Sequence, residues 1–283
     1  MMNFNRPPIF AAALGLTALA FSCSVLAEDS FTWNFSGGDC TANCSGSTPS
    51  KTFQPTSATT PTLVASAWAN TEPGSWNNTL ATAGLNMYSG GLGVTHADGE
   101  PTSSPNHATD NNYRYELVLF DFGAESIALT DVALGWYYND SDLTVLRYAG
   151  VLADPTSVFD STRYEEGFEE LTSNGWVNEG NIDVDGVVNN VGTYGSNVTA
   201  SFNADKDASS YWIVAAYNTA FGPGCDPAGA CENGHSSDYD YFKIQTLTGQ
   251  LGRTPASSVP TPPTFMLMAL GLAWLGRRQM KSA

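Results

Sequence analysis

The sequence predicts an all-β protein, an antiparallel β-sandwich of jelly-roll type with a short surface helix. About ten short segments alternate apolar and polar residues, as strands with one buried face do. Most of these segments are separated by Gly, Asn, Asp and Ser, which are the residues that favour tight turns. The chain lacks the regular succession of strand-like and helix-like segments that indicates a parallel sheet. These observations together favour an antiparallel sandwich.

The expected strands can be placed in order along the chain. Phe31–Phe35 alternates strictly and puts its aromatic side chains on one face. Similar patterns cover Thr62–Ala69, Leu80–Tyr88, Tyr113–Phe122, Ser126–Trp136, Leu143–Tyr148, Val187–Tyr194, Asn197–Phe202, Tyr211–Tyr217 and Tyr239–Thr246. Apolar residues of Pro155–Leu171 recur at helical spacing, so we expect the surface helix there. The Ser-, Thr- and Pro-rich stretch Thr48–Pro61 is typical of a loop.

The N-terminus has the pattern of a secretory signal peptide, residues 1–27. Arg6 precedes the apolar stretch Ile9–Leu26, and the last residues are Val25-Leu26-Ala27, which suits signal peptidase. We therefore expect cleavage after Ala27 and a β-sandwich domain over residues 28–251. Cys23 is expected to leave with the signal peptide, because the residues before it make a weak lipoprotein signal.

The C-terminus has the pattern of a second targeting segment. A Pro-rich linker over residues 252–263 leads to a hydrophobic tail, residues 264–283, in which the apolar run Thr264–Gly276 is followed by Arg277 and Arg278. A helix of this length spans about 20 Å, against a hydrocarbon core of about 30 Å. Two interpretations follow: a short permanent membrane anchor, or a tail that a sorting enzyme removes.

The order of parts in this tail resembles the PEP-CTERM signal, the target of exosortases in Gram-negative bacteria that make exopolysaccharide. That signal carries Pro-Glu-Pro, a hydrophobic helix and an Arg cluster. The corresponding residues here are Val259, Pro260, Pro262, Arg277 and Arg278. Thr261 stands where that signal has Glu. The resemblance implies an exosortase-like enzyme as a partner beside signal peptidase. It also implies transient insertion in the inner membrane before the protein reaches the cell surface or the extracellular space.

Several blocks of the body resemble sequences that recur among exosortase-dependent surface proteins. They are Gly90–Val94, Pro105–Asn111, Glu116–Phe120, Gly135-Trp136, Asp140–Leu143, Tyr211–Val214 and Tyr241–Ile244. This second resemblance implies an extracytoplasmic β-sandwich surface protein. It implies no catalytic residue.

The charge of the chain restricts its partners. The sequence holds 28 acidic and 11 basic residues, a formal net charge of −17, and all of the acidic residues lie between Glu28 and Asp240. Such a body is repelled by nucleic acid and by anionic lipid. The charge favours solubility and the binding of divalent cations, and the alternative is simply a solvated acidic surface.

Four cysteines remain in the body, in two local pairs. An even count in an exported chain favours disulfides, and we expect Cys40–Cys44 and Cys225–Cys231. A zinc site is the alternative, but only His235 lies near either pair, and structural zinc prefers four thiolate or imidazole ligands.

One loop of the body suggests a calcium site. Asp110, Asn111 and Glu116 offer the hard oxygen ligands that Ca²⁺ prefers. The alternative is an Asx turn at Asp110 and Asn111, with Glu116 paired to an arginine. The stretch Asn181–Gly186 matches the first half of an EF-hand loop, but Gly192 stands where that loop needs Glu, and a β-turn explains the stretch equally well.

Signs of catalysis are few. The three histidines lie in loops without a zinc-protease spacing, and no nucleophile elbow, phosphate loop or carboxylate pair stands out. We therefore expect a non-enzymatic protein of the cell surface or matrix, structural or associated with polysaccharide. The alternative is a secreted glycan-active enzyme. Trp68, Trp76, Trp136 or Trp176 could stack on sugars, although tryptophans mostly serve the core.

Overall fold

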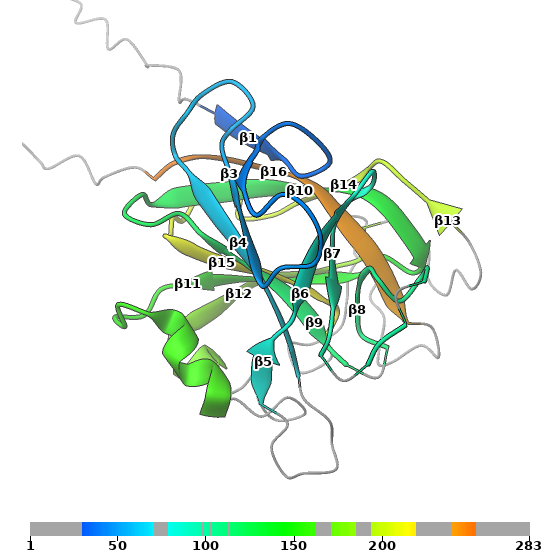
Figure 1. Ribbon diagram of the computed structural model, residues 1–283. Helices are drawn as coiled ribbons and strands as arrows, with labels where there is room; N and C mark the ends of the chain where they lie inside the picture. The colour runs from blue at the N-terminus through cyan, green and yellow to red at the C-terminus, as the bar shows by residue number, and fades with distance from the viewer. Residues whose placement is uncertain are drawn as a thin grey trace, which may run out of the picture.

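The computed structural model describes residues 30–70, 79–97, 99–101, 103–112, 114–161, 171–184, 194–218 and 239–252. It confirms the expected all-β sandwich, because two sheets of antiparallel strands enclose a common core (Figure 1). No helix in these ranges is long and apolar enough to cross a membrane. The signal peptide, the hydrophobic tail and Cys225–Cys231 lie outside the described residues.

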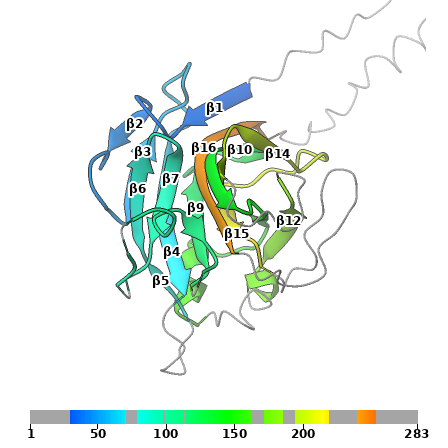
Figure 2. The same cartoon turned by 90° about the vertical axis from the view of Figure 1, so that its right-hand side faces the viewer.

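The first sheet is built around β10 and β16, which lie side by side with β14 in Figure 2. Its strands are β1 (Ser30–Asn34), β6 (Gly84–Tyr88), β7 (Gly91–Thr95), β8 (Thr109–Asp110), β10 (Ile127–Asn139), β13 (Tyr194–Gly195), β14 (Val198–Ser201) and β16 (Asp240–Leu251). β1 pairs with the C-terminal half of β16, where Ser30 lies opposite Gln250. β8 pairs with its start, where Asp110 lies opposite Tyr241. At about 3.3 Å per residue these two ends of β16 are about 30 Å apart.

The second sheet follows the order β12-β11-β15-β9-β4-β3-β2, with β5 also paired to β4. Its strands are β2 (Cys40–Ala42), β3 (Ser50–Phe53), β4 (Leu63–Asn70), β5 (Leu80–Thr82), β9 (Glu116–Asp121), β11 (Leu143–Tyr148), β12 (Trp176–Ile182) and β15 (Tyr211–Ala216). Consecutive residues of β9 and β15 are buried, so both faces of this sheet are covered.

Two apolar clusters explain this double burial. The larger one fills the space between the sheets and includes Trp33, Phe120 and Trp212. The smaller one lies on the other face of the second sheet, where the 3-10 helix η1 (Pro155–Ser161) brings Phe159 against Trp68, with ring centroids 4.8 Å apart. Trp68 and Trp176 therefore serve this second core, and Trp76 lies outside the described residues.

Several boundaries differ from those expected. Leu80–Tyr88 is two strands, because the chain crosses at Ala83 from the second sheet to the first. The strands β7 and β12 were not expected, since Gly and Asn obscure their alternation. Of the expected helix Pro155–Leu171, the start is the 3-10 helix η1, and residues 162–170 lie outside the described ranges. Most of Val187–Tyr194 also lies outside them.

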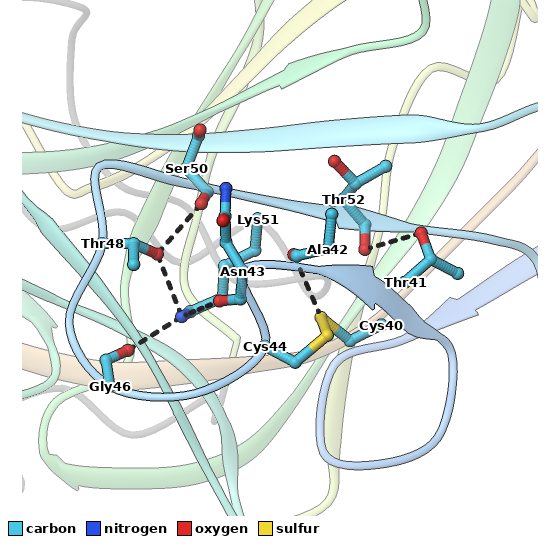
Figure 3. Close-up of a disulfide and its surroundings, with 10 residues drawn as sticks. All are labelled: Cys40, Thr41, Ala42, Asn43, Cys44, Gly46, Thr48, Ser50, Lys51 and Thr52. Atoms are coloured by element: carbon cyan, nitrogen blue, oxygen red, sulfur yellow. Dashed lines mark hydrogen bonds between the residues drawn. A yellow bond between two sulfur atoms is a disulfide. The ribbon is translucent and has the colours of Figure 1, made fainter.

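The expected loop Thr48–Pro61 was wrong in part, because it contains β3. Lys51 and Phe53 both point inward from this strand and are fully buried, so a lysine occupies a position where the pattern requires an apolar residue. Figure 3 shows how the Lys51 ammonium is accommodated: its Nζ donates to the carbonyls of Asn43 at 2.8 Å and Gly46 at 2.9 Å, and to Thr48 Oγ1 at 3.1 Å.

The same hairpin contains the expected disulfide Cys40–Cys44, which is confirmed (Figure 3). It joins the start of β2 to the turn whose carbonyls bind Lys51. A covalent bond and a buried ammonium thus hold one turn from two sides. Because these two cysteines are bonded to each other, they are not available as zinc thiolates.

Candidate metal centre

Two groups of three carboxylates lie near the start of β16. Figure 1 shows that this end of β16 lies away from β1. In each group, carboxylate oxygens from all three residues lie within 4.8 Å of one another. The first group is Glu100, Asp110 and Glu116, and the second is Asp140, Asp142 and Asp240. Asp110 opposes Tyr241, the residue after Asp240, so the two groups are neighbours.

The first group is assembled from a loop and from both sheets. Glu100 lies in the loop between β7 and β8, Asp110 ends β8 in the first sheet, and Glu116 begins β9 in the second sheet. The start of β9 is held by Asn70 at the end of β4, whose Oδ1 accepts the Tyr115 N–H at 2.7 Å. This arrangement brings together side chains from parts of the fold that share no strand pairing.

Each carboxylate of this group is anchored through one oxygen by a backbone N–H. Glu100 Oε2 accepts from His96 at 3.0 Å, Asp110 Oδ1 from Asn112 at 2.9 Å, and Glu116 Oε2 from Asp110 at 3.2 Å. The other oxygens of the two buried residues, Asp110 Oδ2 and Glu116 Oε1, receive no hydrogen bond from the described residues. Asp110 is 1 % exposed and Glu116 is 0 % exposed. Neither of these two buried oxygens has a donor among the described residues, although the Glu100 and Glu116 carboxyl groups are close enough to share a proton in a hydrogen bond.

Burial and mutual repulsion disfavour a negative charge on all three carboxylates of the first group at once. Burial raises the pKa of Glu116, and repulsion from Asp110 and Glu100 raises it further. Burial likewise raises the pKa of Asp110, with repulsion from Glu100 and Asp240. The pKa of Glu100 is raised to about 7, chiefly by burial, against the lowering effect of its hydrogen bond from His96. A proton or a cation is required to relieve this repulsion.

The second group is already tied together by hydrogen bonds. Asp240 Oδ1 accepts the Asp142 N–H at 3.0 Å, and Asp140 Oδ1 accepts the Ser141 N–H at 2.8 Å. Asp240 Oδ2 accepts from the side-chain amide of Asn111. Both oxygens of the Asp240 carboxylate are thus engaged by the protein.

The structure brings together two of the three residues suggested as calcium ligands, Asp110 and Glu116, but not Asn111. The Asn111 amide donates to Asp240 Oδ2 and to the Tyr217 carbonyl at 3.2 Å, and so belongs to the second group. Sequence reasoning missed Glu100, which takes the third place. Its distance along the chain from Asp110 matches no metal-binding motif, so only the folding of the β7–β8 loop reveals it.

The other candidate residues have structural partners. His107 Nε2 lies 3.2 Å from Lys243 Nζ, and its ring packs edge-on against Tyr88. Burial lowers the pKa of His107, and the neighbouring Lys243 charge lowers it further. Asn181 of the EF-hand-like stretch lies on β12, where it accepts from Thr144 Oγ1 at 2.6 Å. The end of that stretch, from residue 185, is outside the described residues, as is His235.

An aromatic row lies on the first sheet at this same end and comprises Trp136, Tyr138, Tyr194 and Tyr241. Ring centroids are 6.1 Å apart for Trp136 and Tyr194, 4.5 Å for Tyr138 and Tyr194, and 5.9 Å for Tyr138 and Tyr241. Tyr194 is 63 % exposed, Trp136 and Tyr138 are half-buried, and Tyr241 is buried at the base of the row. The Lys243 ammonium lies 4.2 Å above the Trp136 ring, a cation–π contact that orients the indole.

No protein-family model matches this chain, and no curated protein or solved structure matches it. The fold and the site define its class: an acidic, antiparallel β-sandwich with a carboxylate centre and an aromatic row at one end. Its function has to be inferred from these residues.

Proposed function

We propose that this chain is an exported protein of the cell surface or extracellular matrix that associates with polysaccharide and is not an enzyme. Its aromatic row is the observation that carries this proposal. Aromatic rings at the surface offer flat apolar faces to which the apolar faces of sugar rings can stack, and their polar edges remain hydrated. The rings of Trp136, Tyr138 and Tyr194 are close enough to one another to contact a single oligosaccharide.

The position of the row agrees with a surface protein. The described body begins and ends beside the Ser30–Gln250 pair, and the row lies at the other end of β16, about 30 Å away. The proposed signal peptide precedes Ser30 and the proposed sorting tail follows Gln250. Both proposed targeting segments are therefore attached at the end of the body opposite the aromatic row.

Export is supported by the Cys40–Cys44 disulfide, since disulfides persist in oxidising compartments. In the proposed route, signal peptidase cleaves after Ala27, and an exosortase-like enzyme then recognises Val259, Pro260 and Pro262 with the basic pair Arg277 and Arg278. The protein passes through an inner-membrane intermediate before release to the surface.

The carboxylate centre is unsuited to glycoside hydrolysis. A glycosidase needs its acid and its nucleophile or base to flank the scissile bond of a bound sugar. Asp110 and Glu116 are buried inside the fold, so a glycosidic oxygen cannot reach them. This burial favours a binding protein over the rival secreted glycan-active enzyme.

The binding proposal is tested by co-sedimentation of the full chain with exopolysaccharide from a producing strain, in parallel with analysis of released sugars. We expect retention without sugar release, and at least about tenfold weaker retention for Trp136→Ala and Tyr194→Ala. Val177→Ala, which removes an exposed apolar side chain on the other sheet, should bind as the wild type does. Undiminished binding by both aromatic variants would refute the role of the row, and release of sugars would favour the enzyme.

The sorting proposal requires a separate experiment. The chain is expressed with and without residues 259–283 in a host that carries an exosortase, and the mature C-terminus is measured by mass spectrometry. We expect a processed C-terminus in the extracellular fraction. Recovery of the intact tail in the inner membrane would show that it is an anchor.

A further inference from the structure

We propose that Glu100, Asp110 and Glu116 bind one calcium ion, which joins the two sheets at this end of the sandwich. The inference goes beyond the proposed function and does not depend on it. It rests on the mutual distance of at most 4.8 Å between carboxylate oxygens of the three residues and on the two buried oxygens that receive no hydrogen bond from the described residues.

A bound cation would satisfy the two buried carboxylate oxygens that receive no hydrogen bond from the described protein atoms. Buried carboxylates in native proteins are paired with a charge, hydrogen-bonded or bound to metal. Here each carboxylate has one oxygen on a backbone N–H, which fixes its orientation, and Asp110 Oδ2 and Glu116 Oε1 remain available. Oriented carboxylates with free oxygens are what a metal site requires, because the ligands need not reorganise when the ion binds.

The kind of ligand and its coordination geometry favour calcium. Ca²⁺ binds oxygen ligands at about 2.3–2.6 Å, so ligands on opposite sides of the ion are about 4.6–5.2 Å apart. Mg²⁺ binds at about 2.0–2.1 Å and demands near-octahedral geometry, which limits this separation to about 4.2 Å. Oxygens within 4.8 Å of one another can reach a single ion of either size, so the preference rests on geometry: three carboxylates from a loop and two strands suit the flexible coordination of Ca²⁺ better than the strict octahedron of Mg²⁺. Carboxylate oxygens without sulfur or imidazole are also the ligands of a hard cation rather than of zinc.

The origin of the three ligands gives the ion a structural role. Glu100 belongs to the β7–β8 loop, Asp110 to the first sheet and Glu116 to the second sheet. A bound ion would connect these three parts at a point where no strand pairing joins them. Glu100 is the least buried of the three, so water reaches the centre most readily on its side and can complete the 6–8 ligands that Ca²⁺ takes.

The test measures calcium binding to the purified full chain after dialysis against EDTA. Calorimetric titration with CaCl2 should show one site, and the melting temperature should rise with calcium concentration, because a ligand that binds only the folded state stabilises it. MgCl2 at equal concentration should raise the melting temperature far less. Glu116→Gln keeps the shape of the side chain but lowers its charge, and should weaken calcium binding at least about tenfold.

Matched controls separate the loss of a ligand from misfolding. Glu125→Gln changes an exposed glutamate outside the centre and should retain the full calcium response. In EDTA, Glu116→Gln should melt at or above the wild-type temperature, because the substitution relieves repulsion from Asp110 and Glu100. If the wild type has the same melting temperature in EDTA and in calcium, the proposal is overturned, and a shared proton remains as the partner of the carboxylates. A response lost only in Asp240→Asn would overturn it in favour of the second group, and an equal response to magnesium would overturn the choice of calcium.

Discussion

The side chain of Asn111 holds Asp240 through two hydrogen bonds: its Nδ2 donates to Asp240 Oδ2, and its Oδ1 accepts the Asp240 N–H at 2.9 Å. The two residues are 129 positions apart in the chain, and both are buried. Through this contact the end of β8 is attached to the start of β16, and the first carboxylate group is attached to the second.

Replacement of Asn111 by alanine should therefore destabilise the protein. The change removes the acceptor of a buried backbone N–H, which costs about 1–3 kcal/mol of unfolding free energy. Urea denaturation followed by tryptophan fluorescence measures this difference. Thr199→Ala, at an exposed position of the edge strand β14, should change the unfolding free energy by less than about 0.5 kcal/mol. Equal effects of the two substitutions would show that the Asn111 contacts do not stabilise the fold.

Gly91 allows β7 to approach β16 closely, and its replacement by alanine should be costly. Its φ is +118°, and an added Cβ would lie 2.1 Å from the carbonyl oxygen of Ile244. Both the backbone conformation and the collision with a neighbouring strand oppose a side chain, so we expect a loss of about 3 kcal/mol. Gly37→Ala is the matched control, since no heavy atom lies within 4 Å of its added Cβ. A similar urea midpoint for both variants would contradict the packing described for β7.

Opening the Cys40–Cys44 disulfide should have a limited effect. The bond closes a loop with a sequence separation of 4, for which chain entropy predicts a loss of about 2 kcal/mol in the double serine variant. Thermal unfolding with and without reductant measures it.

Lys51 should be coupled to this disulfide, since its ammonium binds the carbonyls of Asn43 and Gly46 in the same turn. Lys51→Met should cost about 1.5–3 kcal/mol, the range for hydrogen bonds from a charged group. In a double-mutant cycle the two changes should be non-additive by at least about 0.5 kcal/mol. Strict additivity would show that the bond and the ammonium stabilise the turn independently.

Lys243 should make stability depend on alkaline pH. Burial lowers its pKa from 10.5 to about 8. Between these values the unfolded chain binds the proton that the folded chain has lost, so stability rises with pH by at most about 1.4 kcal/mol per unit. Relative to Lys243→Met, the wild type should therefore gain stability as the pH increases from about 8 to about 10.5. Urea denaturation at several pH values tests this, and a constant difference between the two proteins would contradict the lowered pKa.

The parts of the fold that were predicted correctly depend on neighbours in the chain. Strict alternation in Phe31–Phe35 and the apolar pattern around β15 identify strands without knowledge of their partners. The spacing of Cys40 and Cys44 identifies a disulfide because the two residues are close in any conformation of the turn. Such signals are local, and tertiary contacts rarely override them.

The errors arose where a residue's environment comes from distant segments. Lys51 is buried in β3 because a turn supplies carbonyls to its ammonium, and its polarity concealed the strand. Glu100 joins Asp110 and Glu116 because a loop folds back at the end of the sandwich, whereas Asn111 beside Asp110 turns to the other group. Neither the burial of Lys51 nor the grouping of the three carboxylates can be inferred from spacing along the sequence.

By itself, the sequence determined the class of fold, the one disulfide within the described residues and the acidity of the body, because side-chain alternation, short-range spacing and composition are properties of the chain. It also contains the two terminal patterns that we interpret as targeting segments and on which the proposed route of export rests. Only the tertiary structure decided which carboxylates meet and which aromatic rings form a row. Those groupings depend on strand register and on the packing of one sheet against the other, which bring together residues that the chain keeps far apart.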